Sequence, residues 1–380
     1  MLKSNIAWMK KNVPSDLKVW KGMIQDIDWS QVAAKTKLSL QRDKDRITAE
    51  FKEFAAMDTS AKIDWLMNGD RHLGYLYKKD AIAFARREWK GLKSVGYDFV
   101  GWLKIWGGML NMVMKDPMSI MLAVFEYHWF ASYLATPAVV DRSVFGRRGK
   151  LLQADFDMWV AITHWAEDLI ANLIMADAKI GGNQKINKRI IMFDEMTMAQ
   201  MMAGFPNLLG IPYQMIPVFM VSEMDQLTLI PYIDAIESYG LPSDTCPLPT
   251  AECGCAVKDE YPMCGQGFIA SSMPCDGSVM ATSFQDRRFS KFMPSYPLCM
   301  PVRYDDEDTT EMAAADMKDC IHWVEGLTGE TWNWDTYFAT MEKMNECTRL
   351  EMEKWEINKT HYPQLVGSSF ELFRKWNYEM

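Results

Sequence analysis

The sequence predicts an α/β protein with a large helical N-terminal region. Residues 1–187 carry apolar side chains at helical spacing, and glycine and proline are sparse there. From residue 188, short apolar runs alternate with helical stretches, which is typical of a parallel sheet joined by helices. The pattern becomes helical again after residue 308. We therefore expect a helical region at 1–187, an α/β cluster-binding domain at 188–308 and a helical segment at 309–380.

Two stretches define the helical region. Residues 151–178 have apolar side chains near 3.6-residue spacing, and the Gly181-Gly182-Asn183 run ends this predicted helix. Residues 117–140 are long enough to span a bilayer. However, Glu126 and His128 lie in the middle of that stretch, and each is costly in hydrocarbon. We interpret 117–140 as a buried or interface helix and expect no membrane contact.

The α/β part should contain a parallel sheet of about four strands flanked by helices, of the Rossmann or flavodoxin type. Ligands of such sheets gather at the carboxyl ends of the strands. Helices are expected at 197–203 and 227–239, then from Thr309 or Thr310 to 327, and again from Asp335. The predicted strands, the second of them weakened by Pro217, are 189–193, 214–221, 267–272 and 296–302.

Composition excludes several classes of protein. Hydrophobic residues make up 49% and charged residues 24% of the chain, which is a globular composition. The net charge of −9 argues against a nucleic-acid binder, because such proteins gain affinity from Lys and Arg on phosphates. The first residues show no apolar run of a secretory signal, so we expect a cytoplasmic protein. The 31 methionines are easily oxidised and suit an anaerobic cytoplasm.

All eight cysteines lie between residues 246 and 347, which suggests one chemical site in the α/β part. No C-x-x-C pair occurs, so a zinc ribbon is disfavoured. Cys246 follows the helix ended by Gly240, and Cys275 follows the strand at 267–272. Both positions suit the ligand edge of a parallel sheet, where thiolates can hold a cluster. The alternative that a cysteine is a small buried hydrophobe stays open for both. This buried-hydrophobe alternative is favoured for Cys320 and Cys347, which lie on predicted helices. It is also favoured for Cys299, which we expect inside an apolar strand.

Several segments from residue 188 onward resemble the 2-hydroxyacyl-CoA dehydratase and benzoyl-CoA reductase family. The run YGLPSDTC at 239–246, followed by Ala251 and Gly254, is similar to the first cluster-binding segment of that family. The run GFIASSMPCDG at 267–277 is similar to the second. Further similar segments, in the same order along the chain, are 296–307, 324–329 and 363–373.

The resemblance implies a function and a set of partners. It implies a [4Fe–4S] cluster held by three cysteines with one open iron, and Cys246 and Cys275 match the first two ligands. It also implies an acyl-CoA substrate, a related second subunit in a heterodimer and an ATP-dependent activator protein that injects one electron. One electron added to the thioester lets a 2-hydroxyacyl-CoA lose water, and benzoyl-CoA reductases put electrons into an aromatic ring instead.

The sequence departs from the family at the third ligand. The family takes that cysteine from a C-terminal domain that this sequence does not contain. We expect a fragment, a substitute ligand (Cys264, Cys253 or Cys320), or an incomplete cluster. The acidic residue that often follows the first strand of the family is replaced by Thr197-Met198. No catalytic residue is assigned, and a non-catalytic partner subunit or a related electron-transfer iron–sulfur protein remains the alternative.

Overall fold

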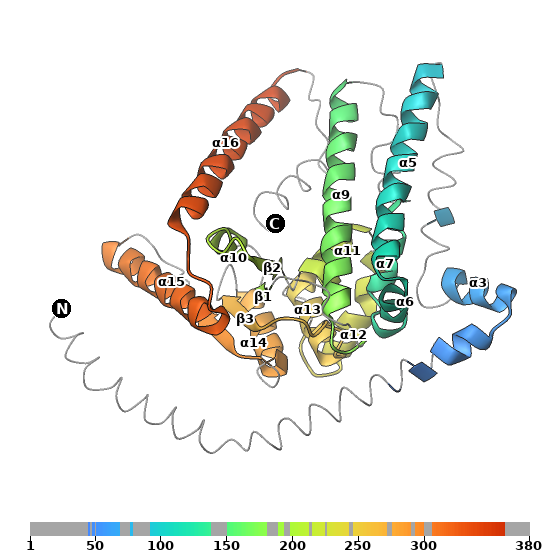
Figure 1. Cartoon of the computed structure of the whole chain (residues 1–380), viewed down its shortest axis with the longest axis horizontal. Helices are drawn as coiled ribbons and strands as arrows, with labels where there is room; N and C mark the ends of the chain where they lie inside the picture. The colour runs from blue at the N-terminus through green and yellow to red at the C-terminus, as the bar shows by residue number, and fades with distance from the viewer. Residues whose placement is uncertain are drawn as a thin grey trace. The chain divides into compact units, whose positions relative to one another are not determined.

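The fold class predicted from the sequence is confirmed by a computed structural model of the chain (Figure 1). It describes residues 45, 48–49, 51–68, 77–78, 92–137, 150–180, 189–193, 198–212, 215–224, 226–242, 246–271, 276–289, 293–299 and 306–361. By its contacts the chain divides between residues 43 and 44. All of 1–43 lies outside the described residues, so the architecture below is that of the second unit.

Four parallel strands form one sheet in the order β2-β1-β3-β4. They are β1 (Arg189–Phe193), β2 (Leu208–Pro212), β3 (Gly267–Ser271) and β4 (Ser295–Leu298). In the register of the sheet, Ile191 pairs with Gly210 of β2 and with Gly267 of β3, and Ser271 pairs with Leu298 of β4. From β1 the chain continues to β2, which lies beside β1 in the sheet, and it later returns to β3, which lies on the opposite side of β1. The strand order therefore reverses between β1 and β3, and such switch points are where open α/β sheets bind ligands.

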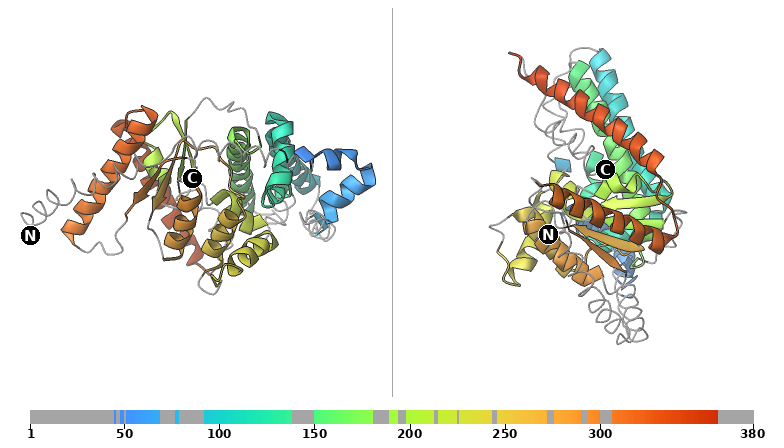
Figure 2. Two further views of the ribbon diagram at one scale, coloured as in Figure 1. Left: turned by 90° about the horizontal axis from the view of Figure 1, so that it is seen from below. Right: turned by 90° about the vertical axis from the view of Figure 1, so that its left-hand side faces the viewer.

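Alternating side chains of each strand give the sheet two covered faces. Ile190 and Met192 of β1 belong to one hydrophobic cluster, and Ile191 and Phe193 belong to another. Helices cover both faces (Figure 2). The first face is covered by α13 (Pro247–Val257) and α14 (Asp276–Phe289), and the second by α10 (Met198–Met202) and α15 (Glu307–Thr328).

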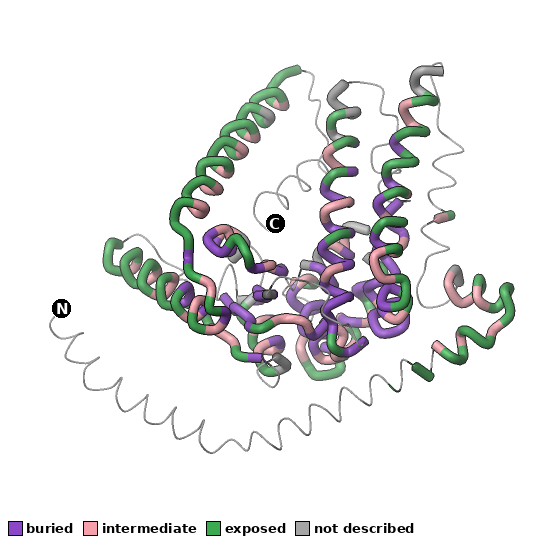
Figure 3. Tube along the Cα trace, viewed as in Figure 1, coloured by how far each residue is buried: buried purple, intermediate pink, exposed green. Residues whose placement is uncertain are grey.

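The described N-terminal helices share a core with the sheet. They are α3 (Thr59–Asn68), α5 (Leu92–Lys115), α6 (Pro117–Glu126), α7 (Phe130–Leu134) and α9 (Lys150–Ala176). Trp129 and Ile174 of this region lie in the same buried cluster as Met192 and Phe268 of the sheet. Helices α6 and α7 are largely buried (Figure 3). The N-terminal helices thus cover one part of the α/β core, although they are distant from the strands in the sequence.

The segment 117–140 is mostly buried, as predicted, over its described part, residues 117–137, although Met118 and Met121 are exposed. It forms two helices, α6 and α7, with a break at residues 127–129. The carboxylate of Asp116 caps α6 by accepting a hydrogen bond from the backbone N–H of Ser119 at 3.3 Å. Within the described part of the chain, no helix is both long and apolar enough to cross a membrane.

The predicted strand at 214–221 is wrong. The segment forms a π-helical turn (Met215–Phe219) followed by α11 (Met220–Met224). Pro217 has no N–H to give to a sheet ladder, which explains why the apolar run is not a strand. The strand is β2, just before it. Its Gly210 is needed because an added Cβ would lie 2.9 Å from the ring of Phe193 and 2.8 Å from the side chain of Met202.

The helices of the second half follow the prediction with shifted starts. A 3₁₀ turn (Gln226–Leu229) leads into α12 (Ile230–Glu237), and α16 (Trp334–Asn358) is the last described helix. The N-cap of α15 is Asp306, which accepts from the N–H of Thr309 at 2.6 Å, and not a threonine. The N-cap of α16 is Asn333 and not Asp335. Helix α16 is exposed along most of its length (Figure 3).

Candidate functional site

Cys246 occupies the N-cap of α13. Its backbone is extended, with φ −162° and ψ 124°, its side chain makes no capping hydrogen bond, and its thiol is half-buried. Its carbonyl accepts a hydrogen bond from the hydroxyl of Thr250 at 2.8 Å. Because α13 returns the chain to the start of β3, its first turn lies toward the carboxyl ends of the strands. The positive end of the helix dipole therefore faces any group held at Cys246, which favours a thiolate or an anionic cluster.

Cys275, the other proposed ligand, lies outside the described residues. In the chain it stands between Ser271, where β3 ends, and Asp276, where α14 begins. The separation of the two sulfur atoms is therefore still a prediction.

Cys264 lies at the opposite edge of the sheet. It precedes β3, and its sulfur is 3.9 Å from the sulfur of Met192. Burial raises the pKa of this thiol well above its usual value. The five residues of β3, at roughly 3.3 Å each, separate it from the carboxyl ends of the strands by about 16 Å. The structure does not bring Cys264 toward the edge where Cys246 lies.

Three further cysteines are core residues. Cys253 and Cys255 of α13 are buried, as is Cys320 of α15. Burial raises the pKa of the Cys253 thiol to about 12, with the nearby Glu252 carboxylate adding to the effect. Burial likewise raises the pKa of Cys320 to about 12. Thiols held neutral in this way are poor ligands for a cluster, which binds thiolates.

Cys299 differs from its predicted environment. The expectation of a buried position inside an apolar strand is wrong, because β4 ends at Leu298 and Cys299 is exposed. Its backbone N–H donates to the carboxylate of Asp316 at 2.7 Å. Among the described cysteines, Cys246 and Cys299 are the two that lie at the carboxyl ends of the strands. Within the described ranges, no group of three His, Cys, Asp or Glu side chains is placed to hold a metal ion.

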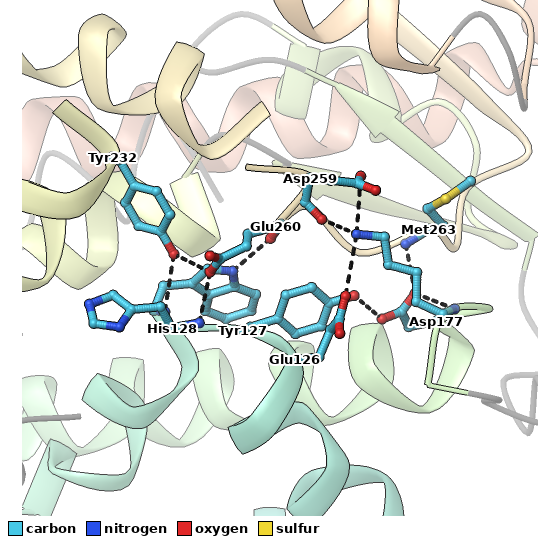
Figure 4. Close-up of polar contacts among 10 residues, drawn as sticks. Glu126, Tyr127, His128, Asp177, Tyr232, Asp259, Glu260 and Met263 are labelled. Atoms are coloured by element: carbon cyan, nitrogen blue, oxygen red, sulfur yellow. Dashed lines mark hydrogen bonds and ion pairs between the residues drawn. The ribbon is translucent and has the colours of Figure 1, made fainter. Parts of the chain in front are cut away.

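A buried polar network anchors the far end of α13 (Figure 4). Its centre is Glu260, three residues beyond the helix. One carboxylate oxygen of Glu260 accepts from the hydroxyl of Tyr232 at 2.6 Å and from the backbone N–H of His128 at 2.8 Å. The carbonyl of Glu260 accepts from the indole N–H of Trp129, also at 2.8 Å. These bonds join α12, the break between α6 and α7, and the loop that leads to β3.

The second half of the network surrounds Lys179 and includes Glu126, Asp177 and Asp259, which Figure 4 labels. The ammonium group of Lys179 donates to the carbonyl of Asp259 and lies 3.2 Å from the carboxylate of Asp259 and 3.7 Å from that of Glu126. Asp177 accepts hydrogen bonds from the hydroxyl of Tyr127 and from the backbone N–H of Met263, the latter at 2.8 Å. Burial raises the pKa of Asp177, and the positive charge of Lys179 opposes this. Buried charges are tolerated where they are paired in this way.

Sequence reasoning found only part of this network. Glu126 and His128 were singled out as costly in a membrane. The structure pairs the Glu126 carboxylate with Lys179, whereas the bond from His128 to Glu260 is made by its backbone N–H. Asp177, Lys179 and Glu260 were missed. The available signal was a lysine two residues after an aspartate at the end of an apolar helix, because a charge in such a place needs a buried partner.

Close backbone packing joins α12 to α13. An added Cβ on Gly254 would lie 1.9 Å from the carbonyl oxygen of Tyr232. Only glycine allows the two helices to approach this closely. The connection between these helices ends at Cys246, so the contact at Gly254 and the bonds of Glu260 together fix the direction in which α13 presents its first residue.

The part of the chain that contains Cys246, Gly254 and Glu260 matches a family model. Residues 226–377 match the family model of the 2-hydroxyglutaryl-CoA dehydratase D-component. The D-component segment includes α12, α13, β3 and β4, so the resemblance stated from the sequence is confirmed there, while β1 and β2 lie outside the match. No curated protein and no solved structure gives a significant match to the chain.

Proposed function

We propose that the chain is an iron–sulfur subunit of a CoA-thioester radical dehydratase, which converts a 2-hydroxyacyl-CoA to a 2-enoyl-CoA, or of a related benzoyl-CoA-type reductase. The observation that carries the proposal is the position of Cys246. It lies at the first turn of α13, toward the switch-point edge of a parallel sheet, within the segment that matches the D-component family. This edge is where such sheets bind ligands.

Cys246 and Cys275 are the proposed thiolate ligands of a [4Fe–4S] cluster. The half-buried, unbridged thiol of Cys246 fits one ligand position. Cys299 is our candidate for a third thiolate, because it follows the carboxyl end of β4, the strand beside β3. Cys264 is left out of the set because it lies before β3. When bound, the cluster would supply a single low-potential electron and an open iron that acts as a Lewis acid.

The partners follow from the same proposal. They are an acyl-CoA substrate, a related second subunit and an ATP-dependent activator protein, all in an anaerobic cytoplasm. The division into regions 1–187, 188–308 and 309–380 also stays a proposal. In this division the α/β region supplies the ligand edge, and the network around Glu260 and Lys179 joins the helical region to it.

A non-catalytic partner subunit is the second candidate. It is favoured by one observation, namely that burial raises the pKa of Cys253, Cys264 and Cys320, so these thiols are poor candidates to complete a ligand set. Such a subunit would pack against a cluster-bearing one and would itself contain no iron.

Iron content after anaerobic purification distinguishes the two candidates. We expect iron and sulfide in a near 1:1 ratio, with the broad visible absorption of a cluster. Cys246→Ala and Cys275→Ala should each remove most of the iron. Cys320→Ala, which changes a thiol in the core behind the other face of the sheet, should retain it. A wild-type chain without iron, or unchanged iron in both ligand variants, contradicts the proposal.

A further inference from the structure

Helix α5 has two apolar faces. One face packs on α9, and its residues Ile105 and Met112 are fully buried. An added Cβ on Gly101 of the same face would lie 2.5 Å from the ring of Phe156 in α9, so the two helices are in close contact. The opposite face of α5 is also apolar, yet it is exposed. A helix that is apolar on both sides ordinarily buries both.

The exposed face has the spacing of a helix-packing seam. Its large members, exposed to between 48% and 64%, are Val100, Leu103, Leu110 and Met114. Gly96 and Gly107 lie in the same row, and no atom lies within 4 Å of a Cβ added to either. The row 96, 100, 103, 107, 110 and 114 advances by four and three residues in alternation, which is the 3.5-residue period of a coiled-coil seam. It runs for about 27 Å at 1.5 Å per residue.

The seam is complementary in size to its own reversed copy. A two-fold axis beside position 105 pairs residues of the two copies whose numbers add up to 210. A large side chain then faces a small one, or a medium one faces a large one. The pairs are Gly96 with Met114 of the second copy, Val100 with Leu110, and Leu103 with Gly107. We propose that α5 packs antiparallel against α5 of a second copy of this chain, forming a symmetric dimer in which the seam residues meet in these pairs.

The charges around α5 agree with this proposal. No member of the seam is charged, and two lysines of the helix pair with acidic residues of α9 instead. Lys104 lies 3.6 Å from Asp157, and Lys115 lies 2.7 Å from Asp168. Covering the seam therefore removes no ionised group from water, which keeps the cost of association low.

The available area suits a stable dimer. Phe99 lies beside the seam, and its ring stacks on that of Trp102 with the ring centroids 6.4 Å apart; both side chains are exposed. Aromatic residues and methionine are enriched at the centres of interfaces. Full cover of the seam and its flank, including Met118 of α6, would bury roughly 700 Å² on each copy, which is near the ~800 Å² per partner of a standard interface.

Two substitutions separate a second copy from other occupants. Leu103→Lys places a charge in the seam. Gly107→Leu adds a side chain for which the single chain has room, but which would collide with Leu103 of the second copy. The matched control is Met312→Lys, which puts the same charge on an exposed methionine of α15.

Sedimentation velocity of the full chain provides the readout, with circular dichroism showing that each variant is folded. We expect a dimer for the wild type and the control, and at least a tenfold weaker dimer for Leu103→Lys and for Gly107→Leu. A wild type that is monomeric up to 50 μM overturns the proposal. So does a dimer that neither substitution weakens, or a monomer whose seam binds phosphatidylcholine vesicles.

The direction of packing has its own test. In an antiparallel pair, position 96 meets position 114 of the second copy, whereas each position meets its own counterpart in a parallel pair. A mixture of Gly96→Cys and Met114→Cys chains should therefore give a cross-link between these two positions with a short bifunctional thiol reagent, identified by mass spectrometry of the linked peptides. Cross-links between two copies of position 114 in the single variant would refute the antiparallel arrangement.

Discussion

Glu167 of α9 should make the stability of this protein fall as the pH rises. Its side chain is buried, and neither of its carboxylate oxygens has a hydrogen-bond partner among the described residues. It lies over Gly108 of α5, where an added Cβ would be 2.4 Å from one carboxylate oxygen. Burial raises the pKa of Glu167 from 4.5 to about 8, and the neighbouring charge of Asp168 adds to this.

The sign and magnitude follow from linkage. Between pH 4.5 and 8, the folded chain holds the Glu167 proton and the unfolded chain releases it. The free energy of unfolding therefore falls as the pH rises through this window. The difference between 4.5 and about 8 corresponds to nearly 5 kcal/mol at 1.36 kcal/mol per pKa unit. Entry of water and relaxation of the helix pair reduce this, so we expect about 2–4 kcal/mol.

Glu167→Gln isolates the effect, because the amide keeps the shape and cannot ionise. Urea unfolding of both chains at pH 5, 7 and 9 should give nearly equal stabilities at pH 5 and a variant that is more stable by about 2–4 kcal/mol at pH 9. The control is Glu346→Gln, at an exposed residue whose pKa is lowered by its hydrogen bond to Arg349. Its effect should be the same at all three pH values. A pH-independent difference for Glu167→Gln would refute the reasoning.

Three more substitutions test core packing, two around α13 and one in α15, each by urea unfolding at neutral pH. Gly254→Ala should destabilise the chain by about 2 kcal/mol or more, because its Cβ collides with the carbonyl of Tyr232; its control, Gly326→Ala, has open space around it in α15 and should stabilise by about 0.5–1 kcal/mol. Tyr232→Phe should cost about 1.5–3 kcal/mol, since the hydroxyl donates to Glu260 and accepts from the N–H of Trp129. Cys320→Val keeps an apolar group in the core and should change stability by less than about 1.5 kcal/mol; a larger loss would show that the thiol has a specific role.

The sequence was a good guide to elements with a simple pattern. The strand at 189–193 and the helix that ends at Gly240 follow from short apolar runs and a glycine stop, and both are found. The strand β2 was missed because Gly210 and Pro212 resemble loop residues, although the glycine is required by neighbouring side chains from β1 and α10. Helix starts were shifted because several residues in each region can cap, and only the three-dimensional path selects one.

The candidate site was predictable only in outline. The placement of Cys246 after a helix and before another is visible in the sequence, and the structure gives it the first turn of α13. The environment of Cys299 was predicted wrongly, because an apolar run does not reveal the residue at which a strand ends. Pairs such as Lys179 with Glu126 join residues more than 50 positions apart, and one sequence contains no signal for such a contact.

The core shared between the N-terminal helices and the sheet has a practical consequence. A shortened chain that begins at residue 188 would leave the face of Met192 and Phe268 without the cover of Trp129 and Ile174. The shortened chain would expose this apolar surface to water, and we expect it to precipitate when it is expressed alone. Attempts to produce the iron-binding part by itself should therefore retain at least α6, α7 and α9.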